Sequence, residues 1–325
     1  MKHSPIGGAV QSFDLLSNQY KNEPKLNTYT LNSNRFKSRI LTLIYVVIKV
    51  IVSLPFYDKL MINASARGFM IVGPFYYLIA RIFRKKIIFR IFGGSLDHIY
   101  IKSNFLLKKI HERTTFKSDT FFLQTNFLIN FFNDKIHNLH WLPTSRPLPE
   151  KRFKKRFNKK VIFLGRLIKE KGTEELNWLS KNINHEYSLA IYGPIGDDFS
   201  RVLLKSNDCY HGKLKPSDVI NTLLQYDILI LPTHFSGEGY PGVIIEAFGA
   251  GIPCVASDWR SIPELVIEGQ NGYLFPTMDK QAMLQCIYKI NNENYERLSK
   301  NAYKQAQKLN SKTVNKQTLE TIISC

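Results

Sequence analysis

The chain has 325 residues, 44% of them hydrophobic, and its 45 Lys and Arg against 26 Asp and Glu give a formal net charge of +19. This length predicts two domains or one large one, and the apolar fraction excludes a mainly disordered chain. Residues 1–150 carry +13 of the charge and residues 151–325 carry +6, so the first half is expected to meet a polyanion: nucleic acid, an anionic leaflet or a phosphorylated substrate.

Cysteine usage and the most apolar stretch set the expected compartment. The four cysteines form no Cys-x-x-Cys pair, which excludes a disulfide scaffold and predicts reduced thiols in a cytoplasmic protein. Residues 40–54 are apolar but are interrupted by Lys49 and followed by Pro55. Because a spanning helix needs about 20 apolar residues, we expect a soluble protein that can rest on a membrane surface.

The first half of the chain alternates short apolar runs with helical ones. Residues 5–13 predict a glycine turn that opens a helix, with only four residues before it in which a strand could form. A further helix is predicted to end at about Arg84. Strands are predicted at 59–65, 86–94, 120–125 and 139–143.

Aromatic, aliphatic and basic residues are interleaved between Phe75 and Lys86. This mixture favours a helix at a lipid interface, with apolar groups at the acyl chains and Lys and Arg among the head groups. A helix packed on the core with a solvated basic face fits the same pattern. The denser basic run at 151–160 is interpreted as a solvated linker, with lipid phosphate or nucleic acid as alternative contacts.

The second half predicts a parallel sheet covered by helices on both faces, because strands rich in Ile, Leu and Val alternate with helices. Strands are predicted at 160–165, 187–193, 227–232 and 253–257, and helices at 172–183, 217–225 and 242–250, with Ser217 as the N-cap of the second helix. Ligands of such sheets bind beyond the carboxyl ends of the strands. The loops there are therefore where a site is expected.

The loop after the first of these strands runs from Gly165 to Gly172. A glycine at the strand end lets a ligand approach the backbone. Arg166 supplies a planar fork and Lys171 a point charge, a pair suited to a diphosphate. Arg and Lys in loops are more often simply solvated.

The most specific segment is Ser236-Gly-Glu238-Gly-Tyr-Pro-Gly-Val-Ile-Ile-Glu246-Ala-Phe-Gly-Ala-Gly-Ile-Pro253. Free backbone N–H groups in the loop and at the helix N-terminus suit an anion. The carboxylates Glu238 and Glu246 would instead accept hydrogen bonds from hydroxyls. A nucleotide sugar has both a diphosphate and hydroxyls. The alternative is a helix whose first turn is acidic because the helix dipole favours it. That alternative explains one glutamate, but it does not explain five glycines around two glutamates.

Together these motifs resemble the carboxyl-terminal domain of glycosyltransferase family 4, of GT-B fold. The resemblance covers roughly residues 158–280 and depends on the ordered series of motifs: Gly165-Arg166…Lys171-Gly172, Glu238-x7-Glu246, Gly251-Ile-Pro253 and Pro263-Glu264…Gly269-x-x-Gly272. In the first half it depends on Gly7-Gly8 and Arg90-Ile-Phe-Gly93-Gly94. No Asp-x-Asp or His-x-x-x-His metal signature occurs in the sequence.

The resemblance implies a role for each matching position. Arg166 and Lys171 would hold the diphosphate and take up the leaving-group charge, beside Gly165. Glu246 would bind the ribose hydroxyls. Glu238 would contact the donor sugar, with the N–H groups of Gly239 and Tyr240 alongside. Gly8 would let the amino-terminal loop close over the phosphates, and the base would lie near residues 210–214, which end at Leu214.

Three departures from the family pattern stand out. The strand that usually precedes the double glycine is nearly absent, so the amino-terminal sheet is expected to lack its first strand unless it is rearranged. Phe92 occupies the position nearest to the amino-terminal His of many members, with His98 or Asp97 as a substitute. Residues 259–261, Trp-Arg-Ser, replace a common pair of glycines.

The sequence thus predicts an α/β protein of GT-B fold, with two Rossmann-like domains facing across a cleft. Residues 1–150 would bind the acceptor, residues 151–308 the nucleotide sugar, and a terminal helix in 309–325 would cross back to the first domain. The expected enzyme is a retaining glycosyltransferase without metal or other cofactor. It would add a sugar to a lipid-linked or oligosaccharide acceptor of bacterial surface polysaccharide, at the inner face of the plasma membrane.

Three other interpretations stay open at this point. A nucleotide-sugar epimerase would keep the fold and convert the donor alone. A phosphorylase would need a longer chain with a pyridoxal-phosphate lysine. A non-catalytic protein that binds nucleic acid or a membrane would account for the net charge.

Overall fold

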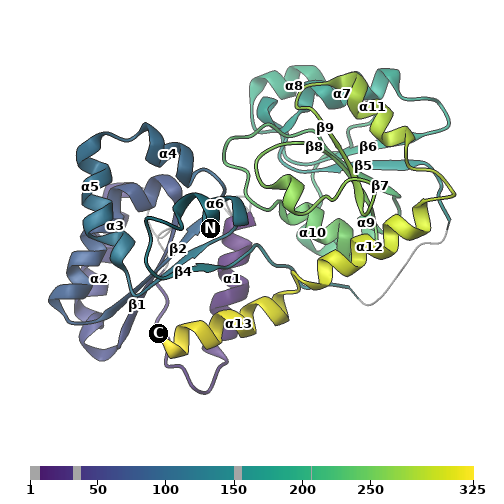
Figure 1. Cartoon of the computed structure of the whole chain (residues 1–325). Coiled ribbons are helices and arrows are strands. Elements are labelled where there is room, and N and C mark those ends of the chain that lie inside the picture. Colours follow the sequence, from purple (N-terminus) through teal and green to yellow (C-terminus); the bar gives the residue numbers. More distant parts are fainter. Residues whose placement is uncertain (1–7, 32–37, 150–155, 206) are drawn as a thin grey trace. The chain divides into compact units, whose positions relative to one another are not determined.

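The computed structural model describes residues 8–31, 38–149, 156–205 and 207–325 (Figure 1). The chain divides into two compact units, each with its own parallel sheet. Unit 1 comprises Met1–Pro143 together with Asn315–Cys325, and unit 2 comprises Thr144–Val314. No helix in the described part of the chain is both long enough and apolar enough to span a bilayer.

Unit 1 is built on a four-stranded sheet in the order β1-β2-β3-β4 with every pair parallel. Its strands are β1 (Lys59–Ser65), β2 (Lys86–Phe92), β3 (Thr120–Leu123) and β4 (Leu139–Trp141). Its helices are α1 (Gly8–Lys21), α2 (Arg39–Ser53), α3 (Ala66–Ile82), α4 (Leu96–Lys102), α5 (Phe105–Arg113), α6 (Asn126–Phe132) and the end of α13 (Ser311–Ser324). All four predicted strands are confirmed, and the described residues before Lys59 form no strand.

One face of this sheet carries the main core of unit 1. Phe89 and Phe121 on β2 and β3 are fully buried and pack edge to face with Phe69 of α3. Alternate residues of a strand point to opposite faces, so Arg90, between the buried Phe89 and Ile91, lies on the other face of β2.

Unit 2 is built on a five-stranded sheet in the order β6-β5-β7-β8-β9, again parallel throughout. Its strands are β5 (Lys160–Leu164), β6 (Ser188–Tyr192), β7 (Ile228–Leu231), β8 (Cys254–Ser257) and β9 (Gly272–Phe275). Its helices are α7 (Thr173–Asn182), α8 (Asp198–Leu204), α9 (Val219–Leu223), α10 (Gly242–Gly249), α11 (Lys280–Tyr288) and α12 (Tyr295–Gln307). The predicted parallel sheet and its first four strands are confirmed, and β9 is an additional strand.

The strand order of unit 2 contains a topological switch point, which cannot be read from the sequence. From β5 the chain passes to β6 on one side and then returns to β7 on the other, so the direction of winding reverses between β5 and β7. In open α/β sheets the ligand binds outside the carboxyl ends of the strands at such a switch point. The loops after β5 and β7 therefore lie where a ligand is expected.

The predicted N-cap at Ser217 is wrong. Residues Pro216–Asp218 form a 3₁₀ turn, and α9 begins only at Val219. Proline at the first position of the turn starts helical structure before the serine. The Ser217 hydroxyl then donates to Asp218 Oδ1 at 2.9 Å instead of capping the helix.

Candidate functional site

Two loops that follow β5 and β7 bring Lys171 and Glu238 together. Lys171 Nζ donates to Glu238 Oε2, and the same oxygen accepts from Thr233 Oγ1 at 2.9 Å. Both side chains of the ion pair are largely buried, with 19% and 8% of their surface exposed. The two predicted residues therefore form one desolvated cluster at the switch point of the sheet.

The backbone of the two loops holds this cluster in place. His234 N donates to Glu170 O at 2.8 Å, which links the loop after β7 to the one after β5. Gly172 then turns the chain into α7 with φ +86°. A Cβ at this glycine would lie 2.3 Å from Pro232 O, so only glycine lets the Lys171 loop approach β7 this closely.

Glu246, in α10, has a partner that the sequence motif did not indicate. Arg146 Nε donates to Glu246 Oε1 at 2.8 Å, with 4% of the arginine and 15% of the glutamate side chain exposed. Backbone bonds fix Arg146 on both sides, from its N–H to Leu309 O at 3.2 Å and from Ser311 N to its carbonyl at 2.9 Å. A Cβ at Gly242 would lie 2.1 Å from Arg146 Nη2, so the glycine at the start of α10 makes room for the guanidinium.

Burial and Arg146 act on the Glu246 carboxyl in opposite directions. Burial raises the pKa of Glu246, and the charge and hydrogen bond of Arg146 lower it by a smaller amount. The net pKa is raised, so Arg146 is what keeps this buried carboxyl closer to its ordinary range.

Arg166 has different neighbours from Lys171. Its exposed side chain lies against Gly196, where an added Cβ would be 2.6 Å from Nε. Burial raises the pKa of Asp197, but hydrogen bonds from Ser200 and Lys169 and the charge of Arg166 together outweigh it, so the net pKa is lowered. Gly165 is hydrogen bonded to Tyr192 O at 3.1 Å, and a Cβ on Gly193 would lie 1.6 Å from Gly165 O.

The loop predicted to lie near the base folds against the end of β6. Tyr210 pairs with Ile191 in a parallel bridge, and its hydroxyl donates to Gly193 O at 3.0 Å. The His211 ring lies 5.3 Å from the Tyr192 ring. Leu214, which closes this loop, is half-buried. The loop thus adds aromatic groups to the same carboxyl edge of the sheet.

Gly239 and Tyr240 occupy the turn between Glu238 and α10. The Tyr240 side chain is buried, and its hydroxyl donates to Glu264 Oε2 at 2.5 Å. Gly242 and Val243 form the first turn of α10, where backbone N–H groups have no acceptor within the helix. This turn presents amide hydrogens beside the buried carboxylates.

In unit 1, Gly8 is the first residue of α1, so the predicted helix after the double glycine is present; Gly7 lies outside the described residues. Arg90 is 97% buried, and its Nε and Nη1 have no hydrogen-bond partner in the described structure. Burial lowers the pKa of Arg90 to about 10. Phe92 lies under the guanidinium at 4.5 Å, and of the suggested histidine substitutes Asp97 is buried and His98 exposed.

The structure therefore joins Lys171 to Glu238 and gives Glu246 a separate partner, Arg146. Sequence reasoning missed Arg146 and Thr233. A basic residue before a linker carries no spacing signal, and a threonine after a strand is common. Only the fold shows that these two side chains contact the predicted glutamates.

Comparison with known families identifies the part of the chain that contains this site. The model of the family "Glycosyl transferases group 1" matches residues 147–305. The matched segment includes the predicted residues of unit 2 from Gly165 to Glu246. The resemblance inferred from the motifs is thereby confirmed.

Curated relatives are similar over part of their length. The putative colanic acid biosynthesis glycosyltransferase WcaL of Salmonella typhimurium is 32% identical over 112 residues, 32% of this chain and 28% of that protein. The matches span between 28% and 48% of the length of the first three such relatives.

Solved structures resemble the chain over nearly its whole length. The Anabaena protein Alr3699/HepE, solved in complex with UDP, superimposes with a TM-score of 0.76 at 15% identity and covers 99% of this chain and 98% of its own. Sucrose-phosphate synthase from Thermosynechococcus elongatus gives 0.72 at 15% identity, covering 97% and 92%. The predicted fold class, two Rossmann-like units of GT-B type, is confirmed.

Proposed function

Since residues 147–305 of this chain belong to the glycosyl transferases group 1 family, we propose that the protein transfers a sugar from a nucleotide-sugar donor to a glycan acceptor in bacterial surface polysaccharide synthesis. The observation that carries this proposal is the buried Lys171–Glu238 pair at the switch point of unit 2. A desolvated cation and a desolvated carboxylate side by side suit a ligand with a phosphate next to hydroxyl groups.

The cation of the pair serves the leaving group. When the bond between the sugar and the diphosphate breaks, negative charge grows on the departing phosphate oxygen, and a fixed cation in a water-poor site stabilises that charge. Lys171 supplies this cation, and the exposed Arg166 can close on the same diphosphate. In this proposal the two side chains replace the divalent metal that other transferases use, and the amide hydrogens before α10 bind further phosphate oxygens.

The carboxylates serve the sugars. Glu238, released from Lys171 when phosphate takes the ammonium group, accepts hydrogen bonds from donor-sugar hydroxyls and orients the anomeric carbon. Glu246, held by Arg146, accepts from the two ribose hydroxyls. Transfer with retention of the anomeric configuration is the reaction that the family resemblance implies, and we include it in the proposal.

The acceptor and its location follow from the other half of the chain. Residues 1–150 carry +13, and a lipid diphosphate is an acceptor whose charge such a surface attracts. We therefore propose a lipid-linked or oligosaccharide acceptor and a peripheral position on the inner face of the plasma membrane.

The first test is donor binding followed by thermal unfolding. Nucleotide diphosphates and nucleotide sugars that bind the folded state should raise the unfolding midpoint, by about 2.7 kcal/mol of added stability at a hundredfold excess over Kd. Glu246→Ala and Arg166→Ala should weaken donor binding about tenfold or more, because each removes a hydrogen bond to a charged group. Glu238→Ala should lower kcat more than it raises Kd.

The matched control is Glu186→Ala, which removes an exposed glutamate of unit 2 that pairs with Lys159. It should leave donor binding and transfer unchanged. Unaltered transfer in the three site variants would reject the assignment of the site. The donor is also incubated without any acceptor and monitored by NMR. Its conversion to an epimer would show that the protein is an epimerase and not a transferase.

A further inference from the structure

Unit 1 leaves an unusually large number of apolar side chains in solvent. Of the 25 large hydrophobic residues exposed in the described structure, 21 belong to unit 1 and four to unit 2. Seven of the 21 lie on α2 alone, whose single charged residue after its first position is Lys49. Soluble monomers rarely expose contiguous apolar patches of this kind without a partner.

Helix α2 is apolar on both of its sides. Val50 and the following Leu54 are buried in the core of unit 1, with Val46 and Val47 packed against them. On other positions of the helix, Ile44, Ile48 and Val52 are 51%, 55% and 60% exposed. These three residues follow each other at intervals of four, so they form one stripe along the helix. A helix that is hydrophobic all round normally lies in a core or in lipid.

Helix α3 repeats this arrangement. Its residues Phe69 and Tyr76 are buried in the same core cluster as Val50 of α2. Ile71, Phe75 and Leu78 form an exposed stripe at helical spacing. Residues 75–86 pack on the core, and their exposed positions are both apolar (Phe75, Leu78 and Ile82) and basic (Arg81, Arg84 and Lys86).

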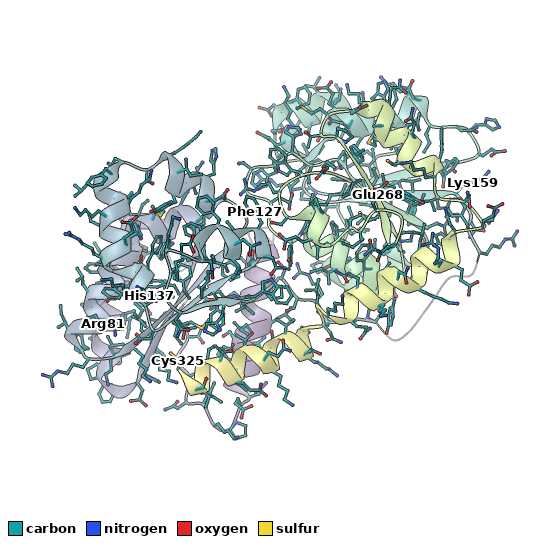
Figure 2. All side chains as sticks on the ribbon, viewed as in Figure 1. Arg81, Phe127, His137, Lys159, Glu268 and Cys325 are labelled. Carbon is teal, nitrogen blue, oxygen red and sulfur yellow. The ribbon has the colours of Figure 1, made fainter. Side chains whose placement is uncertain are left out.

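The sequence that contains these two helices is strongly basic. Between residues 24 and 96 the sequence contains twelve Lys and Arg and one acidic residue, Asp58. Lys85 Nζ donates to Pro55 O at 3.4 Å, which joins the basic turn after α3 to the end of α2. Arg81 extends from the outer edge of unit 1 (Figure 2), stacks on Tyr77 and pairs with Asp119.

We propose that the α2–α3 surface, defined by Ile44, Ile48, Val52, Ile71, Phe75 and Leu78, docks in the interfacial layer of an anionic lipid bilayer. The apolar stripes enter the boundary of the acyl chains, and the neighbouring Lys and Arg lie among the anionic head groups. Helix α2 has 15 residues, too few to span a bilayer, so it lies along the surface. This deepens the proposed function, since it names the partner surface at which a lipid-linked acceptor would be met.

Charge favours lipid over a second copy of the chain as the occupant. A dimer formed through this surface would bring two like-charged basic regions together, which is unfavourable. An anionic leaflet is complementary to the same charges. Because lipid is fluid, it can also cover an irregular apolar face without a matching rigid surface.

Vesicle co-sedimentation of the full chain tests this proposal. Wild type should bind vesicles of phosphatidylcholine mixed with phosphatidylglycerol, and binding should weaken with salt and on vesicles of phosphatidylcholine alone. Ile44→Gln, Ile48→Gln and Val52→Gln combined should lower the partition coefficient on the anionic vesicles about a hundredfold, because the three apolar side chains that enter the lipid on docking are lost. Since all three side chains are exposed, the variant should fold, which its unfolding midpoint checks.

Two further variants make the result specific. Val202→Gln removes an apolar residue of unit 2 that is even more exposed, at 77%, and should leave vesicle binding unchanged. Ile48→Trp should show a blue shift of its added fluorescence when anionic vesicles are mixed in.

Vesicle binding by the triple variant equal to that of wild type would overturn the proposal. So would a wild-type dimer in lipid-free solution that the triple variant abolishes, because the surface would then be an interface between copies. The nucleotide midpoint shift is measured on the same samples. If nucleotides do not raise the unfolding midpoint of wild type, the proposed function is rejected, and the result on vesicle docking still stands.

Discussion

At the scale of single residues, the site depends on charges that are buried in pairs. A buried ion pair is costly to desolvate, and removing one partner leaves the other uncompensated. Lys171 with Glu238 and Arg146 with Glu246 are both of this kind. The first pair is expected to open for the ligand, and the second to stay closed and position a carboxylate.

Arg146→Met should make nucleotide binding depend on pH. Without the arginine, burial alone acts on Glu246, so the pKa of its carboxyl rises further. A carboxyl with a raised pKa gains its proton as the pH falls, and the protonated form accepts fewer ribose hydrogen bonds. In the described structure Arg146 is the charged group that acts on this carboxyl.

Nucleotide Kd should therefore rise as the pH is lowered, and it should rise more steeply in Arg146→Met than in wild type. Arg146→Lys, which keeps the charge, should recover most of the difference. Glu246→Gln combined with Arg146→Met removes the titrating group, so its Kd should be flat with pH. A sloping Kd in that double variant would contradict the explanation.

At the scale of elements, a close approach of two loops determines whether the cluster can form. Gly172 combines a left-handed backbone with a Cβ position only 2.3 Å from Pro232 O. Gly212 also has a left-handed backbone, φ +78°, but a Cβ there would meet no atom within 4 Å. A substitution at Gly212 therefore causes backbone strain alone, whereas one at Gly172 causes both backbone strain and a steric clash.

Gly172→Ala should destabilise the protein more than Gly212→Ala. The latter carries only the cost of a left-handed alanine, about 1–2 kcal/mol. The former must also push the Lys171 loop away from β7, which we expect to bring the loss above about 3 kcal/mol. Urea unfolding measures both; equal losses would show that the loop can relax away from Pro232.

At the scale of the whole molecule, the chain ends in the unit where it begins. Asn315–Cys325 belong to unit 1, where Lys59 Nζ donates to Ile322 O at 2.5 Å. Ile322 is 7% exposed, and its neighbour Ile323 is 43% exposed. The carboxyl terminus is therefore part of the packing of the first unit.

Ile322→Ala should lower the free energy of unfolding by about 2 kcal/mol or more, the usual result of removing a buried isoleucine side chain. Ile323→Ala is the matched control on the same turn of α13 and should change it by less than about 1 kcal/mol. Urea titration of both variants decides the matter. Equal effects would mean that the burial of Ile322 contributes little to unit 1.

The sequence by itself determined the alternation of strands and helices, the donor motifs and the family, because these depend on local periodicity and on residue types at fixed spacing. It did not indicate β9, a four-residue strand whose two middle side chains are half-buried, or the late start of α9 after Pro216.

Only the tertiary structure decided which side chains meet. Lys171 and Glu238 are 67 residues apart, and Arg146 and Glu246 are 100 apart, and no spacing rule joins them. The same holds for the exposed stripes of α2 and α3, since an apolar run predicts burial and cannot say which of its faces the rest of the fold will cover.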